Sequence, residues 1–524
     1  MALDLYDTTL RDGTQQEAVT LSVPDKLRVA TLLDSLGVDY IEGGWPGTNP
    51  KDTEFFAAAA AGDLVLGRAT LTAFGMTRRP GRAADGDPQL VALLAAATPV
   101  VCLVGKAWPL HVTDILRTTA AENLAMIADS IRFLRAEGRQ VVFDAEHFFD
   151  GHLRDPGYAL EVVRVAAESG AECVVLCDTN GGMLPDRVAA VTRRVVSELE
   201  GRCRVGVHTH DDTGCAVANS LMAVRAGAAH VQGTANGIGE RCGNANLMSL
   251  IPTLSLKLGA DVVGAEELAR LTRVAHAVAE IMNLTPDPHA PYVGHAAFAH
   301  KAGLHVSALA RRADTYQHVE PESVGNSARL LVSELAGRST IVLKGRQLGV
   351  DLSGDDDLVG RVLDRVKQLE HAGYTFEAAD ASFELLVHGE VGQAPEPFRL
   401  ESFRAIVERR EDGGVVAEAT VRLWVDDERL IATAEGNGPV DALDQAFRAA
   451  VNGRFAHLEH THLADYKVRI VNAGAGTGAV TRVLVSTTDG EREWETVGVS
   501  PNIIEASWRA LSDAYRYGMM RAGV

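Results

Sequence analysis

Cys203-Arg204-Val205-Gly206-Val207-His208-Thr209-His210 joins an apolar run to two histidines. The run is typical of a buried strand, and residues two apart on a strand point to the same side, so both imidazoles can face one point. Asp12, after the strand-like run 3–7, offers a third ligand. Two nitrogens and a carboxylate oxygen suit a divalent metal such as zinc or manganese with open positions. The alternative for a bare His-x-His is hydrogen bonding at a solvated strand end.

Strand-like runs alternate with amphipathic helical patterns from residue 1 to about residue 260. The expected helices include 24–36, 122–136, 185–198 and 216–226, and glycines follow several of them as C-caps do. About eight β/α units in this length predict a (β/α)8 TIM barrel. A doubly wound sheet is the competing fold, but no Gly-rich fingerprint follows the first strand. The expected strands are 3–7, 38–42, 65–72, 100–104, 141–145, 173–178, 205–208 and 230–234.

Polar residues gather where the expected strands end, which is where the active sites of such barrels lie. Asn244 could be a fourth metal ligand or the N-cap of a helix that begins near Ala245. Glu146 could be an acid–base group or a carboxylate that supports a ligand. The residues at these ends are Arg11, Asp12, Glu42, Thr72, Lys106, Glu146, His147, Asp178, Thr179, Asn180, His208, His210, Asn236, Glu240, Arg241 and Asn244.

The second half of the chain lacks the β/α rhythm. Residues 261–397 read as a helical linker, with expected helices at 265–282 and 358–371. Residues 398–524 read as an α+β domain in which three strands and a helix occur twice. Gly436-x-x-Pro439 recurs as Gly498-x-x-Pro501 before the two helices, which indicates two βββα repeats. We therefore predict three domains: 1–260, 261–397 and 398–524.

The composition limits the partners. The chain has 524 residues and a net charge of −20, from 50 Lys plus Arg against 70 Asp plus Glu. This balance argues against nucleic acid or an anionic membrane as the main partner. No signal peptide or membrane-spanning run is recognisable, and the six cysteines form no Cys-x-x-Cys pair, so we expect a cytoplasmic protein with reduced thiols.

Three motifs resemble a known family. They are Asp7-Thr8-Thr9-Leu10-Arg11-Asp12-Gly13-Thr14-Gln15, His208-x-His210 and Asn236-Gly237-x-Gly239-Glu240-Arg241-x-Gly243-Asn244. With a linker motif at 297–305, they make the chain similar, nearly end to end, to the 2-isopropylmalate, homocitrate and citramalate synthases. Segments 42–47, 105–108 and 144–151 look most like the citramalate branch. The resemblance implies a metal-dependent acyltransferase on a (β/α)8 barrel, with a linker and a C-terminal regulatory domain.

The resemblance also implies roles for single residues. Asp12, His208 and His210 would bind a divalent metal (Mn, Mg or Zn), with Asn244 in or near its shell. Arg11 would contact the 2-oxo acid and meet the charge that develops on its carbonyl oxygen.

Four further roles follow from the same resemblance. Thr179 would bind the carboxylate of the 2-oxo acid, and Glu146 would lie at the substrate end of the site. His305 and Tyr316, in the linker, would help to activate acetyl-CoA.

By this resemblance, acetyl-CoA, pyruvate and water would give citramalate and CoA, on a route to isoleucine. A homodimer and feedback inhibition by isoleucine at the C-terminal domain are implied as well. The nearest alternative is a 2-isopropylmalate synthase acting on 2-oxoisovalerate. A 3-hydroxy-3-methylglutaryl-CoA lyase would not need the second half of the chain, and a non-catalytic amino-acid sensor would not need Arg11, Asp12, His208 and His210.

Overall fold

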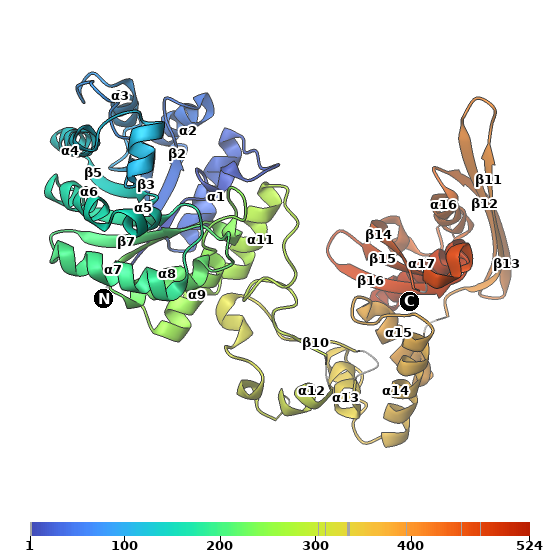
Figure 1. The fold of residues 1–524 in the computed structure, drawn as a ribbon. Coiled ribbons are helices and arrows are strands. Elements are labelled where there is room, and N and C mark those ends of the chain that lie inside the picture. The colour runs from blue at the N-terminus through green and yellow to red at the C-terminus, as the bar shows by residue number, and fades with distance from the viewer. Residues whose placement is uncertain are drawn as a thin grey trace. The chain divides into compact units, whose positions relative to one another are not determined.

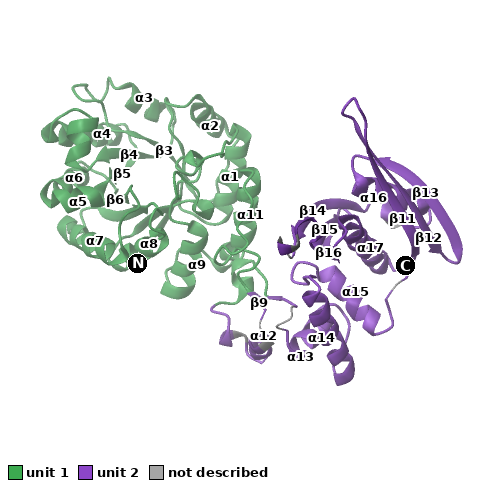
Figure 2. Ribbon diagram, turned by 45° about the vertical axis from the view of Figure 1, so that its right-hand side comes forward, with its two compact units in different colours: residues 1–298, 319–328 green, residues 299–318, 329–524 purple. Residues whose placement is uncertain are grey.

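The computed structural model describes residues 3–301, 303–309, 311–332, 336–394, 396–451, 453–471 and 473–523. The chain forms two compact units (Figure 2). Unit 1 comprises residues 1–298 and 319–328, and unit 2 comprises residues 299–318 and 329–524. None of the described helices combines the length and the apolar character that crossing a bilayer requires.

Unit 1 is a closed barrel of eight parallel strands in sequence order, which confirms the predicted (β/α)8 fold (Figure 1). The first and last strands close the ring, with Asp4 beside His230 and Asp7 beside Gly233. All carboxyl ends of the strands therefore meet at one end of the barrel. The strands are β1 (Asp4–Asp7), β2 (Tyr40–Gly44), β3 (Thr70–Met76), β4 (Val100–Lys106), β5 (Gln140–Glu146), β6 (Cys173–Asp178), β7 (Arg204–Thr209) and β8 (His230–Gly233).

Helices surround the barrel and bury aliphatic faces against the strands. Side-chain caps fix several helix starts. Ser22 and Asp25 form a capping box at the start of α1, and Asn49 and Thr119 cap α2 and α4. The helices are α1 (Val23–Ser35), α2 (Pro50–Ala61), α3 (Pro88–Ala95), α4 (Ala120–Ala136), α5 (Phe148–Arg154), α6 (Pro156–Glu168), α7 (Pro185–Leu199), α8 (Ala216–Arg225), α9 (Leu247–Leu258), α10 (Ala265–Leu268) and α11 (Leu271–Ile281).

Two sequence predictions within unit 1 are wrong in detail. The third strand was expected at 65–72, but β3 begins at Thr70, and Val65 is 81% exposed. Asp34 accepts the backbone N–H groups of residues 67, 68 and 69, which holds this β-prone segment in a loop. Thr72 consequently lies inside β3 and not at its end. The helix expected at 265–282 is divided into α10 and α11.

Unit 2 begins at Ala299, within the segment 261–397 that the sequence analysis reads as the linker. β9 (Ala299–His300) pairs in parallel with β10 (Arg329–Leu330). Four α-helices come after β9 in this part of the chain: α12 (Gly303–Leu309), α13 (Arg338–Gln347), α14 (Asp356–His371) and α15 (Asp380–Glu390). The last three share a small apolar core around Val362 and Phe383.

The C-terminal part of unit 2 contains the two predicted βββα repeats. Each repeat is an antiparallel three-stranded sheet followed by a helix, and the two helices and sheets share one core. The first strand of each repeat carries an irregularity in register at the same place, after Leu400 and after Leu463. The elements are β11 (Arg399–Arg409), β12 (Val415–Val425), β13 (Glu428–Gly436) and α16 (Pro439–Val451), then β14 (His462–Ile470), β15 (Thr481–Thr488), β16 (Glu493–Ser500) and α17 (Ile503–Ala522).

The strand register corrects the basis on which the repeat was predicted. Leu400 pairs with Leu423, and Leu463 pairs with Thr487, so these pairs are equivalent. With these pairs superposed, the start of α16 at Pro439 corresponds to the start of α17 at Ile503. Gly436, however, corresponds to Ser500 and not to Gly498. The Gly-x-x-Pro match is thus two residues out of structural register, although the repeat itself exists.

Candidate metal and substrate site

A cavity of about 320 Å³ opens at the carboxyl ends of the barrel strands. Its walls come from the segments that end or follow β1 to β8, as the barrel prediction required. The lining includes Arg11, Asp12, Trp45, Phe74, Met76, Val104, Lys106, Asp144, Glu146, Cys177, Thr179, His208, His210, Glu240 and Arg241.

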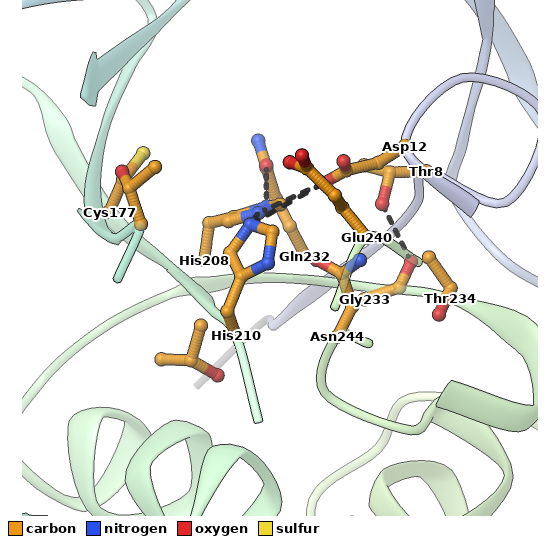
Figure 3. Close-up of polar contacts among 12 residues, drawn as sticks. Thr8, Asp12, Cys177, His208, His210, Gln232, Gly233, Thr234, Glu240 and Asn244 are labelled. Carbon is orange, nitrogen blue, oxygen red and sulfur yellow. Dashed lines mark hydrogen bonds and ion pairs between the residues drawn. The ribbon is translucent and has the colours of Figure 1, made fainter. Parts of the chain in front are cut away.

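Asp12, His208 and His210 converge on one point of this cavity (Figure 3). Asp12 Oδ2 lies 3.2 Å from His208 Nε2 and 3.8 Å from His210 Nε2, and the two Nε2 atoms are 3.2 Å apart. Ligand atoms that each lie about 2.1 Å from a shared zinc or manganese are separated by about 3.0–3.5 Å. Two of the three distances fall in this range and the third, 3.8 Å, is slightly longer, so a small movement of one side chain would let all three atoms bind one metal. All three side chains are buried, with at most 5% exposed.

The protonation of His208 is fixed by a residue that the sequence analysis missed. His208 Nδ1 lies 2.9 Å from Gln232 Oε1, an acceptor only, so the ring proton is on Nδ1. Gln232 Nε2 in turn donates to Asp144 Oδ1 at 3.0 Å. In the neutral form of His208, the form that can bind a metal, the lone pair of Nε2 therefore faces Asp12 and His210. Burial and the neighbouring Glu42 carboxylate raise the pKa of Asp144 to about 6.

Asn244 fits the ligand alternative. Its Oδ1 atom is buried and has no hydrogen-bond partner among the described residues, whereas its Nδ2 donates to Ile238 O. The N-cap of α9 is Asn246, whose side chain accepts from the Met248 N–H, so the expectation of an Asn244 cap is wrong. A Cβ on Gly239, where φ is +156°, would lie 2.1 Å from Asn244 Nδ2, so this approach needs glycine.

Arg11 is held beside the triad by charges and by an aromatic face. Its Nε donates to Glu42 Oε1 at 2.5 Å, and one terminal nitrogen lies 3.3 Å from Asp12 Oδ1. The guanidinium carbon lies 3.9 Å from the centre of the Phe74 ring. Tyr6 donates to the second oxygen of Glu42 at 2.6 Å. Burial raises the pKa of Asp12, but Arg11 and His208 outweigh this effect and hold that pKa below its usual value.

The opposite wall carries Glu146, Lys106 and Thr179. Lys106 forms an ion pair with Glu146. Thr179 Oγ1 accepts the His147 backbone N–H at 2.9 Å. Arg241 donates to the Thr179 carbonyl oxygen at 2.8 Å and pairs with Asp212 at 2.7 Å. Of the polar residues that the sequence placed at the strand ends, nine line the cavity: Arg11, Asp12, Lys106, Glu146, Thr179, His208, His210, Glu240 and Arg241. The lining does not include Glu42, Thr72, His147, Asp178, Asn180, Asn236 and Asn244.

His305 and Tyr316 belong to unit 2. Their rings stack with centroids 4.2 Å apart and an interplanar angle of 28°. The two residues thus lie together, and their catalytic role stays a prediction.

Three family profiles match successive parts of the chain. HMGL-like matches residues 2–278, a homocitrate synthase post-HMGL domain-like profile matches 292–373, and the LeuA allosteric (dimerisation) domain matches 377–519. The chain is 56% identical to the (R)-citramalate synthase of Streptomyces coelicolor, over 99% of this chain and 97% of that protein. Identity to the (R)-citramalate synthase of Aquifex aeolicus is 50%, over 99% and 98%. A probable 2-isopropylmalate synthase of Methanopyrus kandleri is 32% identical, over 97% and 96%. The chain therefore belongs to the citramalate synthase family of HMGL-like barrel proteins.

Proposed function

We propose that this protein condenses acetyl-CoA with pyruvate and water to give citramalate and CoA. The observation that carries the proposal is the buried Asp12, His208 and His210 triad with Arg11 beside it, in a cavity of about 320 Å³. The relatives named (R)-citramalate synthase at 50–56% identity favour pyruvate over the 2-oxoisovalerate alternative, whose named relative is only 32% identical.

Asp12, His208 and His210 would hold a divalent metal, with Asn244 available as a further oxygen ligand. That metal would act as a Lewis acid and template for the 2-oxo acid. A terminal nitrogen of Arg11 lies 3.3 Å from Asp12 Oδ1, so its guanidinium would meet the negative charge that develops when the carbonyl carbon is attacked. Because Glu42 and Phe74 hold Arg11 in place, this stabilisation needs little reorganisation.

The remaining steps need a base and a carboxylate site. A base must remove a methyl proton from acetyl-CoA so that the resulting carbanion can attack the carbonyl carbon of pyruvate. Water then cleaves the thioester, which releases CoA. We assign the base to Glu146, which Lys106 holds at the cavity wall, or to the His305 and Tyr316 pair, acting directly or through water. We assign the carboxylate of pyruvate to Thr179.

Regulation by isoleucine, in a homodimer, is part of the proposal. A second cavity, of about 300 Å³, lies between α16, β14 and α17 and has apolar walls such as Leu463 and Leu511. Asp444 Oδ2 accepts from Arg448 at 2.9 Å, whereas Asp444 Oδ1 is buried and unpaired among the described residues. That oxygen suits the ammonium of a branched amino acid. In the other repeat Trp508 corresponds to Asp444. Trp508 is 5% exposed and packs against the rings of Phe403 and Phe447, so the acceptor that Asp444 offers has no counterpart at this position.

The test is CoA release from acetyl-CoA by metal-replete protein, with pyruvate, 2-oxobutanoate, 2-oxoisovalerate and 2-oxoglutarate compared. The highest kcat/KM is expected with pyruvate, and His208→Ala should abolish release. A preference for 2-oxoisovalerate would move the protein to 2-isopropylmalate synthesis. No release with any of them would overturn the proposal and favour the amino-acid sensor.

A further inference from the structure

We propose that a buried ion pair outside the cavity, between Lys26 and Asp52, positions Trp45 and thereby limits the size of the 2-oxo acid side chain. The inference rests on the proposed function, since it concerns the wall of the same site. Lys26 and Asp52 would be positioning residues, because neither lines the cavity.

The pair is almost completely removed from solvent. Lys26 on α1 is 2% exposed and Asp52 on α2 is 7% exposed. Besides its ion pair with Asp52, Lys26 Nζ donates to the Gly43 carbonyl at 2.8 Å. Asp52 Oδ2 accepts the backbone N–H of Trp45 at 2.9 Å. The two charged side chains therefore hydrogen-bond to the backbone on both sides of Gly44, at the carboxyl end of β2.

The absence of a side chain at Gly44 permits these contacts. Its φ is +147°, and a Cβ there would lie 2.5 Å from the carboxyl carbon of Asp52. The Asp52 carboxylate thus lies directly against the backbone of Gly44, and a side chain at this position would displace it. The direction in which the chain leaves β2, and so the position of Trp45, depends on this contact.

Trp45 packs against the part of the cavity wall that holds Arg11. Its ring meets Phe74 edge to face, with centroids 5.2 Å apart and an interplanar angle of 82°. Phe74 lies against the Arg11 guanidinium at 3.9 Å. Trp45, Phe74 and Met76 line the cavity together. A shift of Trp45 would therefore enlarge the cavity beside this wall, and a longer side chain of the 2-oxo acid could fit there.

A merely structural pair would behave differently on replacement. Buried ion pairs contribute little net stability, and apolar residues of similar volume often replace both partners without loss. The double variant Lys26→Met with Asp52→Leu should therefore fold, but it leaves the Trp45 N–H without its acceptor. Stability and specificity can thus be separated in one protein.

The experiment compares kcat/KM for pyruvate and 2-oxobutanoate in metal-replete protein, with thermal unfolding measured in parallel. The double variant is expected to raise the ratio of 2-oxobutanoate to pyruvate about tenfold, the lower end of what one methylene discriminates, and to leave the KM for acetyl-CoA unchanged. The matched control is Asp4→Leu with Arg204→Met, which removes an ion pair at the opposite, amino end of the barrel. Its ratio should stay as in the wild type.

A coupling test links the pair to Trp45. Trp45→Ala should raise the same ratio, and adding the double substitution to Trp45→Ala should raise it no further, because both act through one side chain. If the double variant does not fold, Asp52→Asn replaces it: Lys26 and Trp45 donate to different oxygens of Asp52, and an amide has only one oxygen, with a donor NH2 in the place of the other. An unchanged ratio in a folded variant, or additive effects with Trp45→Ala, would overturn the inference alone. Failure of the wild type to release CoA would instead overturn the proposed function, and the inference with it.

Discussion

Replacement of Gln232 by methionine should weaken metal binding without removing any ligand. Methionine keeps most of the volume of Gln232, which is fully buried, but offers no acceptor to His208 Nδ1 and no donor to Asp144. A buried N–H left without an acceptor costs about 1–3 kcal/mol. The imidazole can avoid this cost by moving its proton to Nε2, but that tautomer cannot bind the metal. Either outcome lowers affinity, and loss of such supporting contacts typically costs about 10–100-fold.

That range corresponds to about 1.4–2.7 kcal/mol of binding free energy. The assay is a competition titration of Zn²⁺ or Mn²⁺ between the protein and a chromophoric chelator at fixed pH. Gln140→Met is the matched control, because Gln140 is exposed at the amino end of β5, away from the site. A dissociation constant of a folded Gln232→Met protein within twofold of the wild type would refute the argument that Gln232 fixes the His208 tautomer.

Three further predictions concern other parts of the molecule. Arg11→Lys should lower kcat about 100–1000-fold, because an ammonium cannot replace a guanidinium fork held between two carboxylates; a loss below tenfold in steady-state assays would contradict this role. Asp444→Asn should raise the isoleucine concentration for half-maximal inhibition more than tenfold, and an unchanged inhibition curve would exclude this cavity. Burial raises the pKa of Asp513 to about 6, although Ser382 and Arg516 partly offset it. Because the folded pKa is raised, the contribution of Asp513 to stability is lost as pH rises through 6. Denaturant unfolding should therefore show that the free energy of unfolding of Asp513→Asn rises relative to that of the wild type between pH 4 and 7. The relative rise is at most about 3 kcal/mol, because one pKa unit corresponds to about 1.36 kcal/mol. Parallel pH profiles of the two proteins would contradict this prediction.

The barrel could be predicted from the sequence because its signals are local and repeated. Each strand is a short apolar run, and polar residues lie at its carboxyl end or in the loop that follows it. Element ends were less predictable where a distant side chain decides them. Asp34 is more than thirty residues before the loop whose N–H groups it accepts, so nothing near Val65 indicates that this segment leaves the sheet.

The triad could also be predicted, because His208 and His210 lie on one strand end and Asp12 follows another. Gln232 acts through a contact with His208, 24 positions away in sequence, and Glu42 through a contact with Arg11, 31 positions away. A signal for Gln232 did exist: it alternates with Val231 on a buried strand, so its polar side chain had to face the barrel interior. The choice between ligand and cap for Asn244 depended on where α9 begins, a boundary that sequence patterns leave uncertain by one or two residues.

The charges of the cavity connect the metal site with substrate binding. Its lining contains the cations Arg11, Lys106 and Arg241, but each is already paired with a carboxylate: Glu42, Glu146 and Asp212. Asp12, Asp144 and Glu240 add further negative charge to the same walls. In a chain of net charge −20, such a site repels an anionic 2-oxo acid. A divalent cation on the triad would offset two of the three excess negative charges and would be the largest single charge there. Asp12, His208 and His210, by holding that cation, would therefore favour binding of the anionic substrate as well as polarisation of its carbonyl group.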